Sequence, residues 1–451
     1  MELKGYAATI CDVLKRERVI VWIALLTFVI SAGYALIHRI QPAVDASAYN
    51  QIGWNIAQGR GYRLTLDVPP EQDESITYQG PFYPTLLAGI FTVFDHRLEA
   101  VWIIQALLRA ISVVLMYAIC LRIFGPAGRQ IGWIASGLFG AYPDLIEIAA
   151  MLLSETWFLF LTLLIVWIFF RSYERPRIVS SAVLGATFGV AVLTRSSILL
   201  FGLVIAYWCW KRRALVPFIA FGVAAGLVLT PWTIRNASVY RAFIPTMANA
   251  GYNLWVGNRV GGTGDGGNPP ELHEIQRTYG MVGANAYFAD QYAQFVTQHP
   301  LDYVGLTAGR FMKYFSVVRP MGFWFYQTGI AQILFVASSV VASFFLFSLG
   351  AAGISIAWLK ERNEKLRTLS LFVALTVAAV VPVIITTRYR LPIYPFFSIF
   401  AAYAVVRWRS DRKAFTPYAL GGIAAVTAIA VVDAATQTQK IAEHFQLLFG
   451  K

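Results

Sequence analysis

Residues 19–37 read VIVWIALLTFVISAGYALI, an apolar run without a charged side chain. A helix of about 20 apolar residues is long enough to cross the hydrocarbon core of a bilayer. Basic residues precede the run and no small-residue cleavage site follows it, which indicates a retained signal anchor. The sequence therefore predicts that the chain enters a membrane at its first helix.

The rest of the chain repeats this apolar pattern. Hydrophobic residues make up 57% of the 451 residues and charged residues only 14%, against about 25% charged residues in ordinary soluble proteins. This composition excludes a disordered chain, a secreted disulfide scaffold and a cytosolic enzyme. We predict an all-α polytopic membrane protein with about 11 transmembrane helices. The helices are expected near residues 19–37, 100–121, 131–149, 156–170, 178–194, 196–210, 214–231, 329–358, 367–386, 391–406 and 416–433.

Basic residues set the predicted orientation, because the cytoplasmic loops of membrane proteins are enriched in Lys and Arg. If the N-terminus is inside, the inner segments hold 20 of the 37 basic residues and 7 of the 24 acidic ones. These segments then carry the whole net charge of +13, so no nucleic-acid partner is needed to explain it. We predict an inner N-terminus, an outer C-terminus and a location in the inner (plasma) membrane, with the large loops facing the periplasm or outside.

The predicted organisation is one transmembrane domain over residues 1–433 and a short outer tail at 434–451. A first outer loop, residues 38–99, contains a polar amphipathic stretch that begins at Asp45. It also contains an apolar run at 82–94, which is too short to cross the bilayer and suits a helix in the interface.

A second large outer loop is expected over residues 232–328. It contains the glycine-rich stretch 257–270. Glycine favours no single backbone basin, and long loops of compact proteins often serve as lids or binding loops. We therefore predict a mobile lid here.

Ionisable side chains gather at the predicted outer face of the membrane. Charge near the hydrocarbon boundary is costly and indicates a functional site. Simpler explanations stay open for each residue, because an arginine at a helix end can reach lipid headgroups and an acid can stabilise a helix N-terminus. The combination favours function, since guanidinium groups bind phosphate in a bidentate manner. The residues are Asp45, Glu155, Arg195, Arg235, Arg388 and Arg390.

The order of these motifs resembles that of the GT-C glycosyltransferases, the multi-spanning enzymes related to protein O-mannosyltransferases and the aminoarabinose transferase of lipid A. The resemblance covers roughly residues 19–410. In chain order it rests on Asp45, Pro81-Phe-Tyr-Pro84, Leu153-Ser-Glu155, Thr230-Pro-Trp-Thr-Ile-Arg-Asn236, Gly257-Asn258 and Arg388-Tyr-Arg-Leu-Pro-Ile-Tyr-Pro395.

The resemblance implies an inverting transfer of a sugar from a polyprenyl-phosphate donor to an envelope glycolipid, lipopolysaccharide or protein on the outer face. It implies that Asp45 is the catalytic base and that Glu155 is a second carboxylate of the site. The residues expected to bind the donor phosphate are Arg235, Arg388, Arg390 and Arg195. Those expected to bind substrate are Tyr49, Gln79, Tyr83, Asn258 and Tyr389.

Two further expectations follow from the same residues. Many relatives carry Asp-Glu or Asp-x-Asp in the first loop, whereas Asp45 is followed by Ala46 and Ser47. A divalent cation usually takes several oxygen ligands, so we predict a metal-independent site without a cofactor. The alternative function is a polyprenyl-lipid or glycolipid transporter or flippase. We favour the enzyme because the spans lack acids at mid-depth and no internal repeat is visible.

Overall fold

The computed structural model describes residues 17–78, 80–266, 269–318, 329–361 and 363–436. Across these residues the chain folds into helices, joined by turns and by one isolated β-bridge between Asp265 and Ile385. The predicted all-α class is confirmed. The predictions for Gln79 and for the tail beyond residue 436 lie outside the described residues.

The apolar runs predicted to cross the membrane are helical over most of their length. In the described part of the chain, six helical segments are long and apolar enough to cross a membrane by length and composition. This makes the chain a multi-pass membrane protein, while the count of 11 crossings and their orientation stay predictions. The six segments are α2 (Arg18–His38), α5 (Leu98–Phe124) with α6 (Gly128–Gly140), α11 (Leu215–Tyr240), α15 (Gly329–Ile356) with the π-helical turn η6 (Ala357–Glu361), η7 (Thr387–Ile393) with α17 (Tyr394–Ser410), and α18 (Arg412–Thr436).

Shorter apolar helices complete the bundle, and two of the predicted spans are broken. These helices are α7 (Pro143–Ala149), α8 (Glu155–Arg171), α9 (Ile178–Thr194), η4 (Ser196–Leu200) with α10 (Phe201–Lys211), and α16 (Glu364–Ala378). The predicted span 131–149 is split between α6 and α7, because Tyr142 is extended before Pro143 (φ −68°, ψ 122°). The predicted span 367–386 loses its helix after Ala378, ahead of Pro382.

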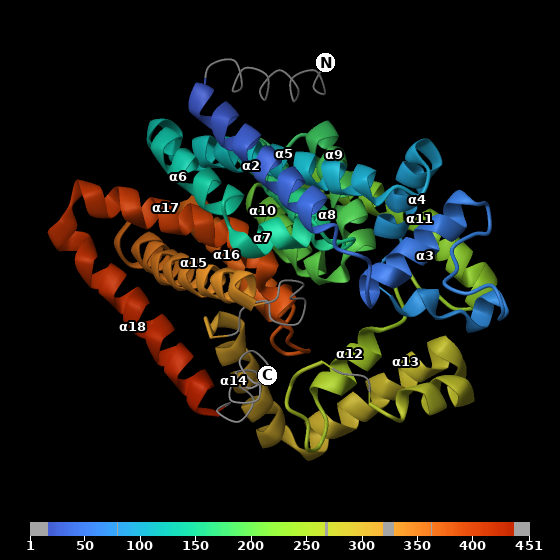
Figure 1. Cartoon of the computed structure of the whole chain (residues 1–451). Coiled ribbons are helices and arrows are strands. Elements are labelled where there is room, and N and C mark those ends of the chain that lie inside the picture. The colour runs from blue at the N-terminus through green and yellow to red at the C-terminus, as the bar shows by residue number, and fades with distance from the viewer. Residues whose placement is uncertain (1–16, 79, 267–268, 319–328, 362, 437–451) are drawn as a thin grey trace.

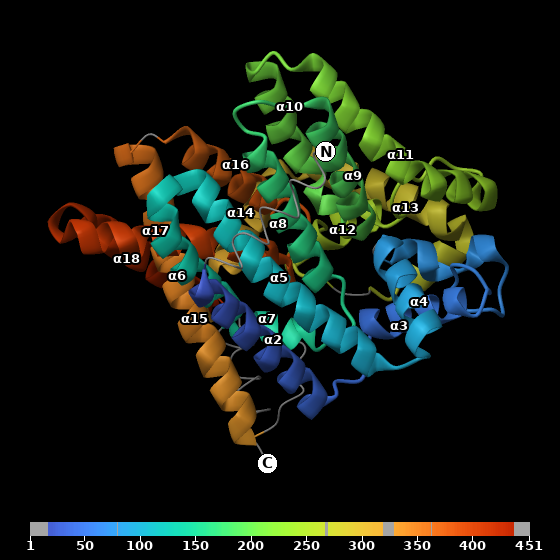
Figure 2. The same cartoon turned by 90° about the horizontal axis from the view of Figure 1, so that it is seen from above.

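The long helix α5 lies at the centre of the first half of the bundle. It packs against α2, α6 and α8, while α15 packs against α17 and α18 (Figures 1 and 2). A further pair, α9 and α11, also packs closely. Gly185 permits this contact, because a Cβ there would lie 2.1 Å from the carbonyl oxygen of Phe221. Small residues at such crossings are typical of membrane helix pairs.

The two predicted outer loops are largely helical. The first contains α3 (Asp45–Ala57) and α4 (Phe82–Phe94), which pack on each other, and α4 matches the predicted interfacial run. The second contains α12 (Ala250–Gly257), α13 (Leu272–Gln298) and α14 (Pro300–Phe315). These yellow helices lie at one edge of the bundle, with α12 and α13 on the same side as α3 (Figure 1). The helix α11 also continues through Pro231 to Tyr240, past the predicted start of the loop.

Candidate functional site

Asp45 is the first residue of α3, at the turn by which the chain leaves the first membrane helix. The turn is strained, because the β-branched Val44 just before it has φ 52° and ψ −119°. Strain of this kind persists only where the surroundings fix it. The turn places the Asp45 carboxylate at the positive N-terminal end of α3, which favours a negative charge.

Glu155 occupies the equivalent position at the start of α8, and it is almost completely buried. Its carboxylate lies 2.7 Å from the guanidinium of Arg195, which follows the last residue of α9. Arg388 of η7 lies 3.8 Å from the same carboxylate oxygen and also forms an ion pair with Asp45. The structure thus gathers Asp45, Glu155, Arg195 and Arg388 into one group, here called the acid–arginine cluster.

The residues around this cluster include three of the predicted substrate-binding tyrosines. Arg195 and Arg388 lie 5.3 and 5.7 Å from the ring centre of Tyr389. Tyr49 and Tyr83 meet edge to face, with 5.4 Å between their ring centres. Burial, followed by the charges of Asp45 and Glu155, raises the pKa of Tyr49 well above its ordinary value, so that its hydroxyl keeps its proton.

Tyr83 faces away from the open part of the site. Its hydroxyl donates to Gln105 at 3.0 Å, and the Gln105 amide donates in turn to the carbonyl oxygens of Ala149 and Met151. Tyr83 does not line the cavity described below, and its contacts hold α4 to the segment before α8. The turn into α4 needs a glycine, because a Cβ on Gly80 would lie 2.1 Å from the carbonyl oxygen of Leu193.

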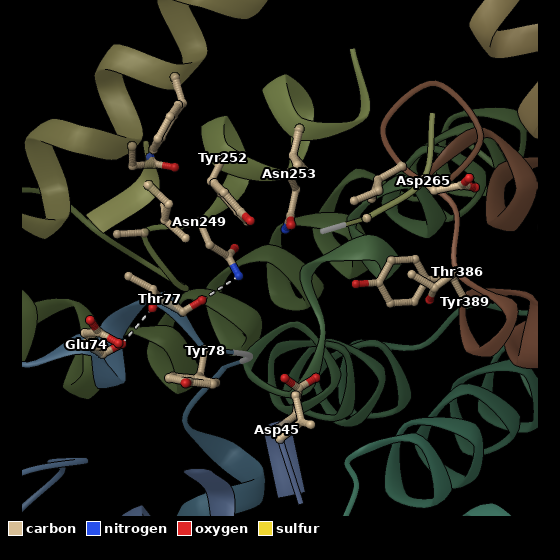
Figure 3. Close-up of a pocket in the computed structure, with 18 of the residues that line it drawn as sticks. Asp45, Glu74, Thr77, Tyr78, Asn249, Tyr252, Asn253, Asp265, Thr386 and Tyr389 are labelled. Carbon is tan, nitrogen blue, oxygen red and sulfur yellow. Dashed lines mark hydrogen bonds between the residues drawn. The ribbon is translucent and has the colours of Figure 1, made fainter. Parts of the chain in front are cut away.

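A cavity of about 580 Å³ opens beside the cluster, within the usual range for small-molecule sites. Asp45, Tyr49, Arg388, Tyr389 and Arg390 line it, whereas Glu155 and Arg195 do not. Figure 3 shows the Asp45 carboxylate pointing into this space, between Tyr78 on one side and Tyr389 on the other. The two acids therefore differ in access: Asp45 faces the cavity, and Glu155 is buried behind Arg388.

Arg390 lies two residues after Arg388 in the same 3₁₀-helix and also lines the cavity. Its side chain is buried, donates to the carbonyl oxygen of Ser316 at 2.6 Å and lies 5.7 Å from the ring centre of Phe347. Arg388 and Arg390 thus line the same cavity, as the predicted phosphate-binding role requires.

Two predicted site residues lie elsewhere. Arg235 donates to the carbonyl oxygen of Tyr62 at 3.1 Å and packs on the rings of Tyr62, Trp232 and Tyr240. These contacts tie α11 to the first outer loop, and Arg235 does not line the cavity. The sequence placed Arg235 near the outer end of a predicted membrane span. It did not indicate the direction in which the side chain projects from α11.

The side chain of Asn258 also makes structural hydrogen bonds and does not line the cavity. Its amide donates to the carbonyl oxygens of Leu254 and Val383, at 2.8 and 3.0 Å, and its oxygen accepts from Arg310 at 2.7 Å. Arg310 is itself fully buried and donates to the carbonyl oxygens of Gly257 and Val381. Together these contacts bind α12 and α14 to the chain segment just before η7.

The first part of the glycine-rich stretch is held by α14 and by the chain segment just before η7. Lys313 of α14 donates to the carbonyl oxygen of Thr263 at 2.7 Å and pairs with Asp265 at 2.8 Å. Asp265 forms the β-bridge with Ile385. Of the predicted lid, Asp265 and Gly266 line the cavity, and residues 267–268 lie outside the described part.

Several cavity residues were not predicted from the sequence. Tyr78 and Glu74 come from the segment before α4, and other polar groups come from α12 and α13. Counted from Asn249, the residue before α12, the lining positions follow the pattern i, i+3, i+4 and i+7 of one helix face. This spacing was available in the sequence, but the region had been interpreted as a loop. The further lining residues from this region are Asn249, Tyr252, Asn253, Val256, His273, Gln276 and Asn285.

The acid–arginine cluster does not fit a metal ion well. Asp45 and Glu155 each contact a guanidinium, which occupies the space and supplies the positive charge that a cation would bring. Among the described residues, no group of three or more His, Cys, Asp and Glu side chains is placed to hold an ion. A divalent cation usually takes more oxygen ligands than these two acids offer.

Comparisons with known proteins agree with the resemblance seen in the motifs. The family model described as dolichyl-phosphate-mannose-protein mannosyltransferase matches residues 78–234. No curated protein sequence matches the chain. Among solved structures, the oligosaccharyltransferase of Archaeoglobus fulgidus in its apo form is similar with a TM-score of 0.55 at 13% identity, over 93% of this chain and 55% of that one.

Two further solved structures were found in the same comparison. The Archaeoglobus fulgidus oligosaccharyltransferase in complex with Zn and sulfate gives a TM-score of 0.52 at 13% identity, over 92% of this chain and 52% of that one. ArnT from Cupriavidus metallidurans bound to undecaprenyl phosphate gives 0.41 at 14% identity, over 87% and 78%. The chain spans about half the length of the oligosaccharyltransferase, so this likeness concerns the fold.

Proposed function

We propose that this chain, which resembles the GT-C glycosyltransferases in its fold and over residues 78–234, is an inverting glycosyltransferase. It moves a sugar from a polyprenyl-phosphate donor to an acceptor of the cell envelope, at the outer face of the inner (plasma) membrane. One observation carries the proposal: a carboxylate, Asp45, faces a cavity that Arg388 and Arg390 also line. A base beside two phosphate-binding groups is what this reaction needs.

The reaction would be a single displacement. Asp45 accepts the proton of an acceptor hydroxyl while the hydroxyl oxygen attacks the anomeric carbon of the donor sugar. The bond from that carbon to the phosphate oxygen breaks, and polyprenyl phosphate leaves with the bonding electrons. Attack from the side opposite the leaving group inverts the anomeric configuration.

Arg388 and Arg390 would stabilise the leaving phosphate, because negative charge develops there in the transition state. A guanidinium has five N–H donors, so Arg388 can bind a phosphate oxygen while it keeps its contact with Asp45. The predicted role of Arg195 as a phosphate ligand becomes an indirect one. Arg195 and Glu155 pair behind the cavity wall and hold Arg388 and Tyr389 in place.

The ion pairs of the two carboxylates with arginines support a reaction without a metal ion. This expectation can be tested directly. We expect purified protein to transfer sugar at the same rate with and without a chelator, because the two arginines supply the positive charge. The measurement is sugar transfer from a polyprenyl-phosphate-linked hexose to an envelope extract, before and after incubation with EDTA. Complete loss of activity that is restored by one divalent metal would contradict this assignment.

The predicted orientation places Glu271, at the start of α13, outside the cell. We expect a Glu271→Cys variant to react with a membrane-impermeant maleimide in intact cells, since Glu271 is exposed and the basic loops are predicted inside. The variant needs Cys11→Ser, while Cys120 and Cys209 are buried. The matched control is Arg175→Cys in a predicted inner loop, which should react only after the membrane is opened. The reverse pattern would overturn the topology.

A further inference from the structure

The cavity has two chemically different sides, which meet at Asp45. One side consists of the segment from Ile384 to Arg390 with Asp265 and Lys313, and it contains all three of the lysine and arginine side chains that line the cavity. The other side consists of Glu74, Thr77 and Tyr78, of Ala248 and Asn249 just before α12, and of residues of α12 and α13. Figure 3 shows the two sides apart, with Tyr389 and Thr386 facing Tyr78, Tyr252 and Asn249 across the space above Asp45.

We propose that the α12–α13 side is the acceptor subsite and that it binds a neutral, hydroxyl-rich glycan. The inference rests on the proposed glycosyl transfer and names the acceptor class. Since the arginines that would bind the donor phosphate lie on one side of Asp45, the acceptor hydroxyl must approach the base from the other. The groups that it meets there decide which acceptor is bound.

Four neutral amides lie among the polar lining residues of this side, beside apolar side chains such as Leu272 and Phe288. Asn249, Asn253, Gln276 and Asn285 all line it, and a primary amide both donates and accepts hydrogen bonds, as a sugar hydroxyl does. Asn249 donates to the carbonyl oxygen of Thr77 at 2.7 Å, and Asn285 accepts from the backbone N–H of Gly251 at 2.8 Å. Each of these contacts uses one end of the amide and fixes its orientation, so that the other end is presented in a set direction.

The aromatic residues on this side suit the same ligand. Tyr78 and Tyr252 line the cavity, and Figure 3 shows the hydroxyl of Tyr252 and the amide of Asn253 directed into it. A tyrosine offers an apolar ring face and a polar hydroxyl, which match the C–H face and the hydroxyls of a pyranose. Asn249, Tyr252, Asn253 and Val256 follow the spacing of a single helix face, so α12 and the residue before it present them together.

The charges on the two sides argue against a phosphorylated acceptor. Lys313 is paired with Asp265, and Arg388 with Asp45. On the α12–α13 side the ionisable lining residues are Glu74 and His273, with no lysine or arginine among the lining residues. An acceptor that carried phosphate groups would meet the Glu74 carboxylate and find no guanidinium partner, which costs binding free energy.

A peptide acceptor fits the same wall less well. Extended peptides are commonly bound through backbone hydrogen bonds to an exposed strand edge. In the described part of the cavity wall, α12 and α13 are helices, with a kink in α13 at Gly280, and they present side-chain amides to the cavity in place of a strand edge.

The test uses the full-length purified protein and a radiolabelled polyprenyl-phosphate-linked hexose. The acceptors are envelope glycans separated by anion exchange into neutral and phosphorylated fractions, and a third fraction of envelope peptides. We expect label in the neutral glycans. In Asn253→Ala the KM for the neutral fraction should rise about tenfold, the effect of one lost hydrogen bond, while the donor KM stays within about threefold. Gln298→Ala, which removes an exposed amide from α13 outside the cavity, is the matched control and should change neither constant.

Asn253→Asp has nearly the same size and guards against a folding defect in the alanine variant. It should also raise the acceptor KM, and more strongly for any phosphorylated glycan. Label confined to the phosphorylated glycans or to the peptides, or an unchanged acceptor KM in both Asn253 variants, would overturn the inference while leaving glycosyl transfer intact. If no fraction led to cleavage of the donor, the proposed function itself would fall, and the inference with it.

Discussion

Replacing Asp45 with asparagine is expected to lower the rate of sugar transfer by about 10²- to 10⁴-fold, the usual contribution of a positioned base. Asparagine keeps the size and the hydrogen-bonding ability of the side chain but removes the oxygen that accepts the proton. Binding of the donor lipid should largely survive, because Arg388 keeps its contact with Glu155. The measurement is kcat and donor KM for the purified variant.

The matched control for this substitution is Asp290→Asn, which neutralises an exposed carboxylate on α13 away from the cavity. It should retain the kinetics of the wild type. Turnover of Asp45→Asn close to the wild-type value would remove Asp45 from the role of base. The role would then pass to Glu155, although that side chain is buried behind Arg388.

Replacing Arg388 with lysine should lower kcat by about 10²- to 10³-fold, as the loss of one group that stabilises developing charge does in other enzymes. Lysine keeps the charge but not the planar guanidinium, so it cannot contact Asp45, Glu155 and a phosphate at once. Arg235 provides the matched control, because it was predicted to have the same role but lies outside the cavity.

Arg235→Lys should therefore leave kcat within about threefold of the wild type, even if it loosens the contact of α11 with Tyr62. Measuring both variants as kcat per folded protein separates catalysis from stability. An equal loss in the two variants would contradict the assignment of the cavity, and full activity of Arg388→Lys would reduce Arg388 to a structural or lipid-facing contact.

All four residues of the acid–arginine cluster were named from the sequence, for a physical reason. Asp45, Glu155, Arg195 and Arg388 each lie where an apolar run begins or ends, and hydropathy locates such boundaries well. Charged side chains at one depth of a membrane protein avoid lipid and turn toward the protein interior. Shared depth therefore predicted that such residues gather at one face, and these four do converge in the structure.

The same reasoning failed for Arg235, because depth does not fix the direction in which a side chain leaves its helix. Asn258 was predicted from the family resemblance, which does not report the contacts of its side chain. The side chain of Arg235 packs on aromatic rings, and Asn258 is bonded to backbone carbonyls that come from a distant part of the chain. Neither set of partners has a local signal in the sequence.

The amide-lined side of the cavity was missed for a different reason. The helix α12 has only eight residues, and no apolar run marks it within the polar second loop. Its spacing of lining residues is helical, but a single short helix is marginal by itself. Its formation depends on packing against α13 and on the Arg310 contacts, which sequence patterns do not report.

The central claim is that the chain transfers a sugar and does not merely move a lipid. Purified protein in liposomes, supplied with a labelled polyprenyl-phosphate-linked hexose and an envelope extract, distinguishes the two. The account predicts that label passes into an envelope product with inverted anomeric configuration, and that polyprenyl phosphate accumulates in equal amount. Movement of intact donor across the bilayer without any labelled product would contradict it.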